Sequence, residues 1–386
     1  MRIGYLHVDY GEWTDGSYNT QEIGLAKSFE KLGHESIIIY WVKRSSKKCF
    51  TEVLITDKIK KVYLPCYHIK HNVVFNPNHL KKYNLDLIHI QSDNLLYVPE
   101  VVRFCKNNSI PYYCYIGTLK SSSPNRISRL VIDTMSRRNY SVFRKSKVFA
   151  KTPEVKRELE KLNINNVEVA PVGLDLTIIP AISKSREEIL EDFGIHKDKK
   201  IVMCVCALRV DKQPLDFFKL VDLLNEEYFF VFVGTGILSP EFESEIEKRN
   251  MYDRLKHIHK IPNIDIHQLY SISDYVVNFN ENEIFGMSIL EAMYHGCTVV
   301  ARFAPGPNST IINEVSGFLV NSIKEMAEVI NSDRQIGGIA KEHVIKNFTW
   351  DTMAEMVLDY YGEGREKIIK IKGRYKGESS SSNDLL

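Results

Sequence analysis

Two glutamates, Glu283 and Glu291, stand eight positions apart in the segment YVVNFNENEIFGMSILEAMYHG at residues 275–296. The β-branched and aromatic run 275–279 predicts a short buried strand, and a helix is expected to begin near Gly286. On one continuous helix the two carboxylates would lie about 80° out of phase. With Glu283 in the loop and Glu291 in the second turn of the helix, both can border the space above the carboxyl end of the strand.

The start of that predicted helix supplies a second chemical group. Its first backbone N–H groups have no partner within the helix and form the positive end of the helix dipole, which attracts phosphate. The groups expected to face the ligand belong to Phe285, Gly286, Met287 and Ser288. The two carboxylates could bind the hydroxyl groups of a ligand, and the N–H groups could bind its diphosphate. A ligand with both kinds of group is a nucleotide sugar. An ordinary strand-loop-helix crossover with an acidic start explains the same pattern.

The composition is that of an ordinary globular enzyme. The chain has 386 residues, of which 44% are hydrophobic and 26% charged, and its net charge of +2 gives no reason to expect nucleic acid. Seven cysteines without a C-x-x-C pair indicate a reducing, cytoplasmic setting with neither a disulfide framework nor a zinc cage. The N-terminus leads directly into a strand, and no apolar run approaches about 18 residues, so neither a signal peptide nor a membrane span is expected.

Strand-like runs alternate with helical patterns along the chain, which predicts an α/β protein with parallel sheets. Two series of strands are expected, with a boundary in the segment PVGLD at residues 171–175. The first series is predicted at residues 2–8, 36–41, 85–90, 111–116 and 147–150. The second series is predicted at residues 200–207, 228–233, 255–258, 275–279 and 298–302.

An ordered set of motifs resembles the retaining glycosyltransferases of family 4, which have the GT-B fold. The first is Glu283-x7-Glu291 within ENEIFGMSILEAMYHGCTVVA. The others are GS at 16–17 with QEIGLA at 21–26, LGHE at 32–35, LDLIHI at 85–90, VAPVGLD at 169–175, VCALRVDK at 205–212, VFVGTG at 231–236 and NFTW at 347–350. The resemblance spans roughly residues 1–362, and such a set is far more specific than any one member.

The resemblance implies two Rossmann-like domains that face each other across a cleft. Residues 1–175 would form the acceptor-side domain and residues 176–345 the domain that binds the nucleotide sugar. Residues 346–365 would form a helix that crosses back to pack on the first domain. Residues 366–386, which end in GESSSSNDLL, are expected to be a disordered tail.

The family transfers a sugar from a nucleoside diphosphate, often UDP, to an acceptor hydroxyl with retention at the anomeric carbon. It usually needs no metal, and no cofactor or D-x-D motif is expected here. Fixed positive groups, chiefly Lys212 and the helix start, would then stabilise the departing diphosphate. By analogy Glu283 binds hydroxyls of the donor sugar and Glu291 the ribose. The leaving phosphate oxygen can take the acceptor's proton, so no protein general base is assigned.

Further donor and acceptor contacts are expected from loops. Gly16 and Ser17 form a small loop near the donor diphosphate, and Gly117 and Thr118 follow a strand on the acceptor side. Two positions depart from the family pattern. Ala207 stands where the family has a phosphate-binding arginine. Arg209, two residues later, is a candidate to compensate: strand alternation puts both on the same side, but the loop begins there. Ile116 stands where the family often has histidine.

These departures keep a second hypothesis open beside the first. The first is a metal-independent hexosyltransferase that builds a cell-surface glycan such as a capsule, on a glycan or lipid-linked acceptor. The second is a weak or inactive family member that serves as a binding partner of another transferase. A sugar-nucleotide epimerase of the same fold is a third possibility.

The stretch 119–147 contains eight basic residues and a single acid, Asp133, with apolar residues between them. This pattern predicts one or more basic amphipathic helices. The apolar stripe either packs on the first domain or docks on an anionic membrane surface, where it would bring a lipid-linked acceptor to the cleft. The second alternative predicts a cytoplasmic protein held peripherally on the inner face of the membrane.

Overall fold

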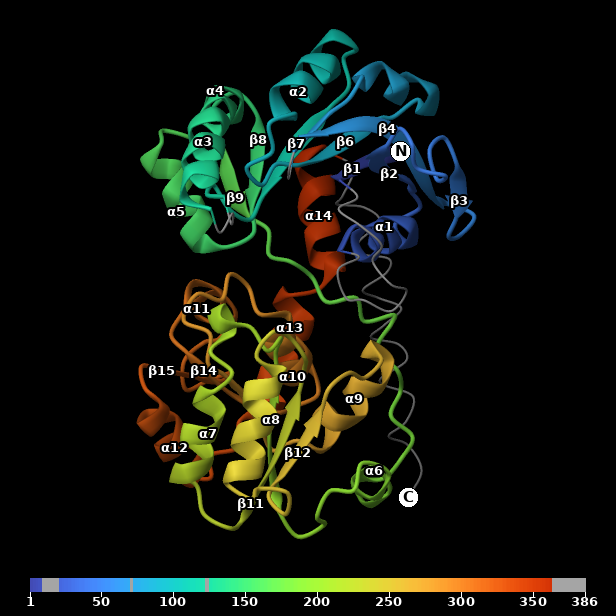
Figure 1. Cartoon of the computed structure of the whole chain (residues 1–386). Coiled ribbons are helices and arrows are strands. Elements are labelled where there is room, and N and C mark those ends of the chain that lie inside the picture. The colour runs from blue at the N-terminus through green and yellow to red at the C-terminus, as the bar shows by residue number, and fades with distance from the viewer. Residues whose placement is uncertain (9–20, 70–71, 122–124, 363–386) are drawn as a thin grey trace, which may run out of the picture. The chain divides into compact units, whose positions relative to one another are not determined.

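The computed structural model describes residues 1–8, 21–69, 72–121 and 125–362, and these residues divide into two compact units (Figure 1). The first unit holds the described residues up to Gly173 and again from Trp350 onward, and Leu174–Thr349 lie in the second. Gly16, Ser17 and the predicted tail at 366–386 lie outside the described residues. Each unit has its own buried hydrophobic cluster, one around β-sheet residues such as Ile90 and the other around residues such as Phe230.

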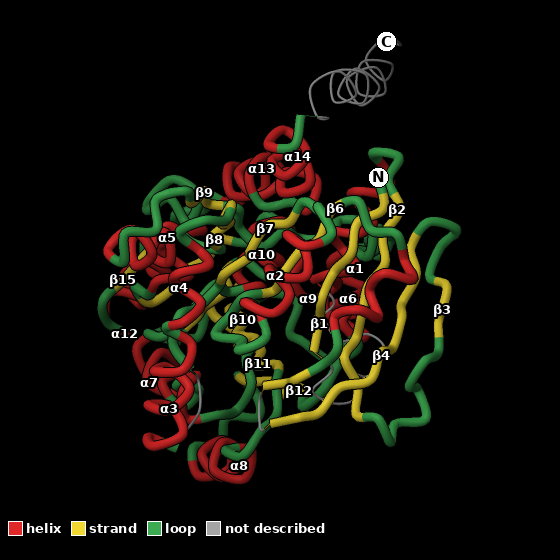
Figure 2. The backbone as a smooth tube through the Cα atoms, turned by 90° about the horizontal axis from the view of Figure 1, so that it is seen from above, coloured by secondary structure: helices red, strands yellow, loops and turns green. Residues whose placement is uncertain are grey.

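The first unit is built on one mostly parallel sheet with the strand order β3-β4-β2-β1-β6-β7-β8-β9, and β5 pairs antiparallel with β4. Figure 2 shows β3 at the edge of this sheet, where it runs antiparallel to β4. The strands are β1 (Arg2–Val8), β2 (Glu35–Lys43), β3 (Glu52–Leu54), β4 (Ile59–Ile69), β5 (Asn72–Val74), β6 (Leu87–Gln91), β7 (Tyr112–Ile116), β8 (Lys147–Ala150) and β9 (Val167–Val169).

The helices of the first unit include segments from both ends of the chain. They are α1 (Gln21–Lys31), α2 (Val98–Asn107), α3 (Arg126–Ser136), α4 (Arg138–Phe143), α5 (Pro153–Lys161) and α14 (Trp350–Tyr360), with the 3-10 helix η1 (Pro77–Tyr83). Helix α14 packs on α1, where the indole of Trp350 lies against Gly24 and Lys31 pairs with Asp351 at 3.1 Å. The last described helix of the chain is thus part of the first unit (Figure 1).

The second unit has a wholly parallel sheet with the order β12-β11-β10-β13-β14-β15. Its strands are β10 (Lys200–Val205), β11 (Tyr228–Val233), β12 (Leu255–Ile258), β13 (Tyr275–Asn278), β14 (Thr298–Arg302) and β15 (Phe318–Val320). Its helices are α6 (Arg186–Asp192), η2 (Val210–Lys212), α7 (Asp216–Leu223), α8 (Ser239–Lys248), α9 (Asn263–Ile272), α10 (Met287–Tyr294), α11 (Pro305–Thr310), α12 (Ile323–Asn331) and α13 (Gly337–Asn347).

The strand order of the second unit reverses at its centre. From β10 the chain continues to β11 and β12 on one side, and from β13 it continues to β14 and β15 on the other. The loops that leave β10 and β13 therefore diverge and open a crevice between the carboxyl ends of these two neighbours. Crevices at such a switch point are where ligands bind in open α/β sheets.

Most of the predicted strands are confirmed, and five of them have the predicted bounds, namely β1, β8, β11, β12 and β14. The prediction for 200–207 was wrong at its end, because β10 leaves the ladder at Val205, where its pairing with β11 stops at Val233. The strands β3, β4, β5, β9 and β15 were missed. Strand β4 buries alternate residues such as Val62 and Leu64, but the adjacent Lys60 and Lys61 near its start interrupt the apolar alternation.

The contact between Gly24 and Trp350 yields a prediction about stability. A Cβ added at Gly24 would lie 2.4 Å from the indole of Trp350, so Gly24→Ala should lower the free energy of unfolding of the first unit by about 1–3 kcal/mol. Gly338 has no atom within 4 Å of the corresponding Cβ position, and Gly338→Ala in α13 is the control. Its effect should stay within about 1 kcal/mol, with a stabilising sign.

Urea unfolding followed by circular dichroism reports both units, and tryptophan fluorescence reports the first unit, because Trp41 and Trp350 lie there. The smaller ring of Trp350→Phe should relieve the crowding, so the double variant should be less unstable than the sum of the two single variants. Equal stability of Gly24→Ala and the wild type would contradict this packing.

Candidate functional site

A pocket of about 350 Å³ opens at the carboxyl ends of β10 and β13. Its wall comes from residues 204–207, from Lys212 and from residues 278–280 and 283–288. All of these residues belong to the second unit, and they surround the switch point of its sheet. Pockets of roughly 300–1,000 Å³ suit small ligands and cofactors.

The start of α10 forms one side of this pocket. Gly286 is its N-cap, with φ of 87°, and among the described residues no side chain caps the helix. The first turn also lacks an acidic residue. The N-terminal N–H groups thus present the positive end of the helix dipole at the wall formed by Phe285, Gly286, Met287 and Ser288, as the sequence predicted for an anion site.

A neighbouring loop holds this helix start in place. The N–H of Gly306 in α11 donates to the carbonyl of Glu283 at 2.7 Å. A Cβ at Gly306 would lie 2.5 Å from the nitrogen of Phe285, so only glycine allows the two backbones to approach this closely. The segment Ala304–Asn308 therefore supports the pocket from behind Glu283.

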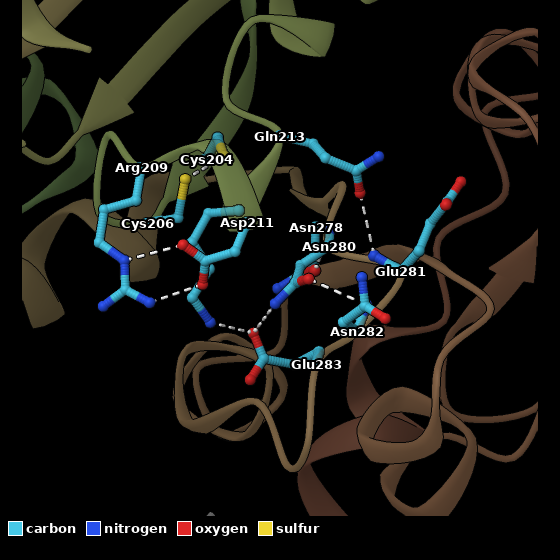
Figure 3. A network of polar contacts seen from close by, with 11 residues as sticks. Cys204, Cys206, Arg209, Asp211, Gln213, Asn278, Asn280, Glu281, Asn282 and Glu283 are labelled. Atoms are coloured by element: carbon cyan, nitrogen blue, oxygen red, sulfur yellow. Dashed lines mark hydrogen bonds and ion pairs between the residues drawn. The ribbon is translucent and has the colours of Figure 1, made fainter. Parts of the chain in front are cut away.

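Lys212 and Glu283 meet in the wall of the pocket. The Nζ of Lys212 lies 2.8 Å from Oε2 of Glu283. The amide of Asn280 donates to the same oxygen at 3.0 Å (Figure 3). The two side chains of the ion pair are only 25% and 15% exposed. Hydrogen bonds between charged groups are short and strong when partly shielded from water, so this pair fixes both side chains.

A second hydrogen bond joins the loops that carry these two residues. Gln213, which ends η2 with φ of 52°, accepts the N–H of Glu281 on its side-chain oxygen at 3.1 Å (Figure 3). The loop after β10 and the loop after β13 are therefore tied together across the crevice. Lys212 and Glu283 owe their proximity to this tie and to the adjacency of β10 and β13.

Arg209 is not brought to the pocket. Its guanidinium pairs with Asp211 at 2.6 Å, lowers the pKa of that carboxyl and remains 59% exposed (Figure 3). The argument from strand alternation was wrong, since β10 ends at Val205 and Arg209 lies in the following loop. Ala207 itself lines the pocket and leaves space where the family has an arginine.

Glu291 is also absent from the residues that line the pocket. It is 4% exposed and faces α9, where its carboxylate accepts the hydroxyl of Tyr270 at 3.1 Å and approaches the amide of Asn263 at 3.5 Å. Burial raises its pKa to about 7, and the two hydrogen bonds oppose that rise. The prediction that it would border the same space as Glu283 is not met in this conformation, and its contact with ribose stays a prediction.

A separate polar cluster lies at the carboxyl edge of the sheet in the first unit. The backbone N–H groups of Gly117 and Thr118 both donate to Oδ1 of Asp93. The Nζ of Lys151 lies 3.3 Å from the other oxygen of Asp93 and 5.0 Å from the ring centre of Tyr115. Since both N–H groups are occupied, the groups offered to a ligand here are the carboxylate and the ammonium.

The sequence interpretation missed Asn280, Asp93 and Lys151. Each follows the end of a strand by one or two residues, namely β13, β6 and β8. Polar residues at the carboxyl ends of parallel strands face the ligand edge, so their positions in the sequence carried a usable signal. Ile116, in contrast, is wholly buried and offers no polar group.

Comparison with known proteins identifies the unit that carries the pocket. Residues 185–333 match the model of the family described as glycosyl transferases group 1. The match covers most of the second unit. The switch-point pocket, its Lys212–Glu283 pair and the start of α10 all lie within the matched residues.

Curated relatives match at low identity. The chain is 23% identical over 237 residues to a D-inositol 3-phosphate glycosyltransferase of Xylanimonas cellulosilytica, covering 56% of this chain and 57% of the relative. It is 28% identical over 218 residues to the glycosyltransferase 1 domain-containing protein 1 of Xenopus tropicalis, covering 52% and 62%. These matches thus span about three fifths of the relatives. A longer match, 22% over 365 residues and 87% and 88% of the two chains, is to the alpha-monoglucosyldiacylglycerol synthase of Acholeplasma laidlawii.

Solved structures show that the fold is GT-B, as predicted. The sucrose-phosphate synthase of Thermosynechococcus elongatus superposes with a TM-score of 0.71 at 16% identity, covering 93% of this chain and 98% of that one. A glycosyltransferase of Rickettsia africae gives 0.71 at 19%, covering 95% and 98%. HepE of Anabaena, solved with UDP and glucose, gives 0.67 at 16%, covering 93% and 98%.

The raised pKa of Glu291 yields a prediction about pH. The folded protein holds this proton up to about pH 7, whereas the unfolded chain releases it near the ordinary value of 4.5. The resulting stability is therefore present below pH 4.5 and lost as the pH rises through 7. Glu291→Gln keeps the Tyr270 contact and removes the titration, so it should gain stability over the wild type by about 1–3 kcal/mol between pH 5 and pH 8.

Urea unfolding at a series of pH values measures this difference. His267 and His295 are joined at 2.9 Å beside Tyr270, and burial lowers the pKa of each to about 4, so they also titrate across the acidic range. Their contribution is common to both proteins and cancels in the comparison. A stability difference that does not change with pH would refute the assignment.

Proposed function

We propose that the chain is a retaining glycosyltransferase that moves a hexosyl group from a nucleoside diphosphate sugar, in the simplest case a UDP-sugar, to an acceptor hydroxyl. One observation carries the proposal: the Lys212–Glu283 pair and the uncapped start of α10 converge on one pocket at the switch point. The group 1 family match over 185–333 supports a transferase, and the complex of HepE with UDP supports the choice of nucleotide.

In this mechanism the donor diphosphate lies on the N–H groups of α10 and beside Lys212. An ammonium group has three donors, so Lys212 can hold Glu283 and a phosphate oxygen together. Both positive groups are fixed before the reaction and stabilise the charge that develops on the leaving diphosphate. The free oxygen of Glu283 then faces the hydroxyls of the sugar, and the leaving phosphate takes the acceptor's proton.

We propose that this reaction runs without a metal ion, since the sequence has no D-x-D motif and Lys212 with α10 supplies the positive charge. Asp93 and Lys151 are the candidate polar groups toward an acceptor in the first unit. They would take the place of the family histidine that Ile116 replaces.

Helix α3 supports a lipid-linked acceptor at a membrane surface. Four of its apolar side chains are exposed, namely Ile127 at 76%, Leu130 at 68%, Val131 at 50% and Met135 at 48%. At 100° per residue they occupy an arc of about 140°, and Arg126 and Arg137 lie at one edge of that arc. The packing alternative predicted that this stripe would be covered by its own domain, which the exposure contradicts for α3.

The opposite side of α3 is the side held by the first unit. Asp133 accepts the amide of Asn94 at 3.2 Å and the N–H of Ser121 at 2.7 Å. Anchored in this way, α3 presents an apolar face with flanking arginines, which fits an anionic bilayer interface. The name of the Acholeplasma laidlawii relative, a glucosyldiacylglycerol synthase, supports a lipid acceptor. No helix in the described part of the chain is long and apolar enough to cross a membrane.

We further propose that the product belongs to a cell-surface polysaccharide such as a capsule. The rival hypothesis of an inactive binding partner rests on Ala207, which lines the pocket, and on Arg209, which is turned away from it. A catalytic test decides between the two.

Turnover should depend on Lys212 and Glu283. Lys212→Ala and Glu283→Gln should each lower kcat about 10²- to 10³-fold, because each removes a fixed charge from the reacting centre. Arg209→Ala should change kcat less than about 10-fold, since an exposed ion pair contributes little. Lys219→Ala is the control, because Lys219 pairs with Asp216 on the surface of α7. Release of the nucleoside diphosphate from a panel of donors and acceptors measures all four.

Inactivity of the wild type with every donor, combined with a thermal shift on UDP binding, would favour the binding-partner hypothesis. Full activity of Lys212→Ala would contradict the proposed stabilisation of the leaving group. Both outcomes are read against the unchanged rate expected of the Lys219→Ala control.

Vesicle binding should depend on the exposed face of α3. The wild type should sediment with vesicles that contain phosphatidylglycerol, and the double variant Ile127→Ser, Leu130→Ser should bind at least about tenfold more weakly because it buries less apolar surface. Replacing Arg126 and Arg137 by Gln should weaken binding mainly at low salt. Ile339→Ser in α13 removes a side chain that is 53% exposed and serves as the control. Absence of vesicle binding at low salt would end the membrane hypothesis.

A further inference from the structure

Two histidines and a glutamate come together at the outer edge of the sheet in the second unit. His257 lies on β12, His259 directly follows that strand, and Glu243 projects from α8. One ligand atom from each of the three lies within 4.8 Å of the other two. These residues are outside the lining of the donor pocket, so the proposed transferase reaction leaves the cluster without a role.

The hydrogen bond on one side of His257 determines what the other side can do. Its Nε2 lies 2.8 Å from the carbonyl oxygen of Gly234. A carbonyl can only accept, so Nε2 carries the hydrogen. In the neutral ring Nδ1 then has a lone pair, and this lone pair faces Oε1 of Glu243, which is also an acceptor. Two acceptors face each other only when a cation lies between them.

The third residue favours a metal ion over a proton as that cation. A proton shared by His257 and Glu243 would satisfy those two groups alone, whereas a metal ion would use a ligand atom from all three residues. The Nε2 of His259 lies 3.2 Å from the same Oε1 of Glu243. Ligands bound to Zn²⁺ at roughly 2.0–2.2 Å in a tetrahedron are separated by a little over 3 Å, close to the spacing of His259 and Glu243. The contact of His257 with the same oxygen is shorter, so these two side chains must move apart to admit the ion.

The surroundings of His257 have the form found around metal-bound histidines. Such a histidine almost always donates its second N–H to a backbone carbonyl or a carboxylate, which fixes the tautomer and the ring orientation. The carbonyl of Gly234 does this for His257. His257 is itself shielded, with only 4% of its side chain exposed, whereas His259 is 60% exposed and open to solvent.

We propose that Glu243, His257 and His259 form a binding site for one divalent transition-metal ion, with Zn²⁺ as the expected occupant and water as the fourth ligand. Nitrogen and carboxylate ligands of this kind suit Zn²⁺. The ion would join α8 to the end of β12. Through His257 and Gly234 it would also hold the end of β11.

Backbone contacts connect this site to the wall of the donor pocket. A Cβ at Gly234, whose φ is 154°, would lie 1.9 Å from the carbonyl oxygen of Cys206. The backbone at Gly234 is therefore in direct contact with the backbone at Cys206. The N–H of Cys206 donates to Val233 at 3.1 Å, and Cys206 lines the pocket. Metal binding should therefore stabilise the second unit. The metal would take no part in the proposed reaction, which depends on Lys212 and Glu283.

Metal titration of the full chain tests the site. After treatment with a chelator, the wild type should bind one Co²⁺ per chain with the visible absorption of a tetrahedral complex, and Zn²⁺ should displace it. The absorption should lack a thiolate-to-cobalt band in the near ultraviolet, because no cysteine belongs to the site. Zn²⁺ should also raise the melting temperature by several degrees.

His257→Asn and His259→Asn should each weaken Co²⁺ binding at least about tenfold, within the range known for lost metal contacts. His196→Asn is the control, because His196 is an exposed histidine of the same unit. Circular dichroism and the thermal shift on UDP binding check that each variant is folded. Tight binding that survives His259→Asn, a thiolate band, or failure of the folded wild type to bind Co²⁺ would overturn the proposal.

Discussion

The reversal of strand order between β10 and β13 is the constraint on which the rest of the second unit depends. Because both strands are parallel and adjacent, their carboxyl ends lie together while their following loops move apart. The residues that line the switch-point pocket are brought together by this one arrangement. The Gln213–Glu281 hydrogen bond and the contact of Gly306 with Phe285 then hold the diverging loops at a fixed separation.

The two glutamates of one motif occupy opposite environments. Glu283 lies in a loop, where Lys212 and Asn280 stabilise its charge. Glu291 lies in the core, where burial disfavours its charge and Tyr270 only partly offsets that cost. One motif therefore provides two different groups. Glu283 is the charged group at the pocket, and Glu291 is the buried group that fixes α10 to α9.

Much of this site could be predicted from the sequence because its information is local. The apolar run before Glu283 and the glycine after it predict a strand, a loop and a helix start, and these elements are present at β13 and α10. The orientation of the side chains was harder to predict from the sequence. Arg209 is turned toward Asp211 in its own loop, and Glu291 toward Tyr270 on α9. Strand and helix periodicity predicts neither partner. Gly16 and Ser17 fall outside the described residues.

The place of α14 has a consequence for how the chain folds during synthesis. The described residues of the second unit, Leu174–Thr349, form one continuous segment, so they have all left the ribosome before Trp350 emerges. Until Trp350 and the rest of α14 emerge, the helix that covers α1 and Gly24 in the first unit is missing. Domains generally fold as units in the order of their synthesis. Among the described residues, the unit that begins the chain is therefore completed last, and the apolar surface that α14 covers stays exposed until that helix has been made.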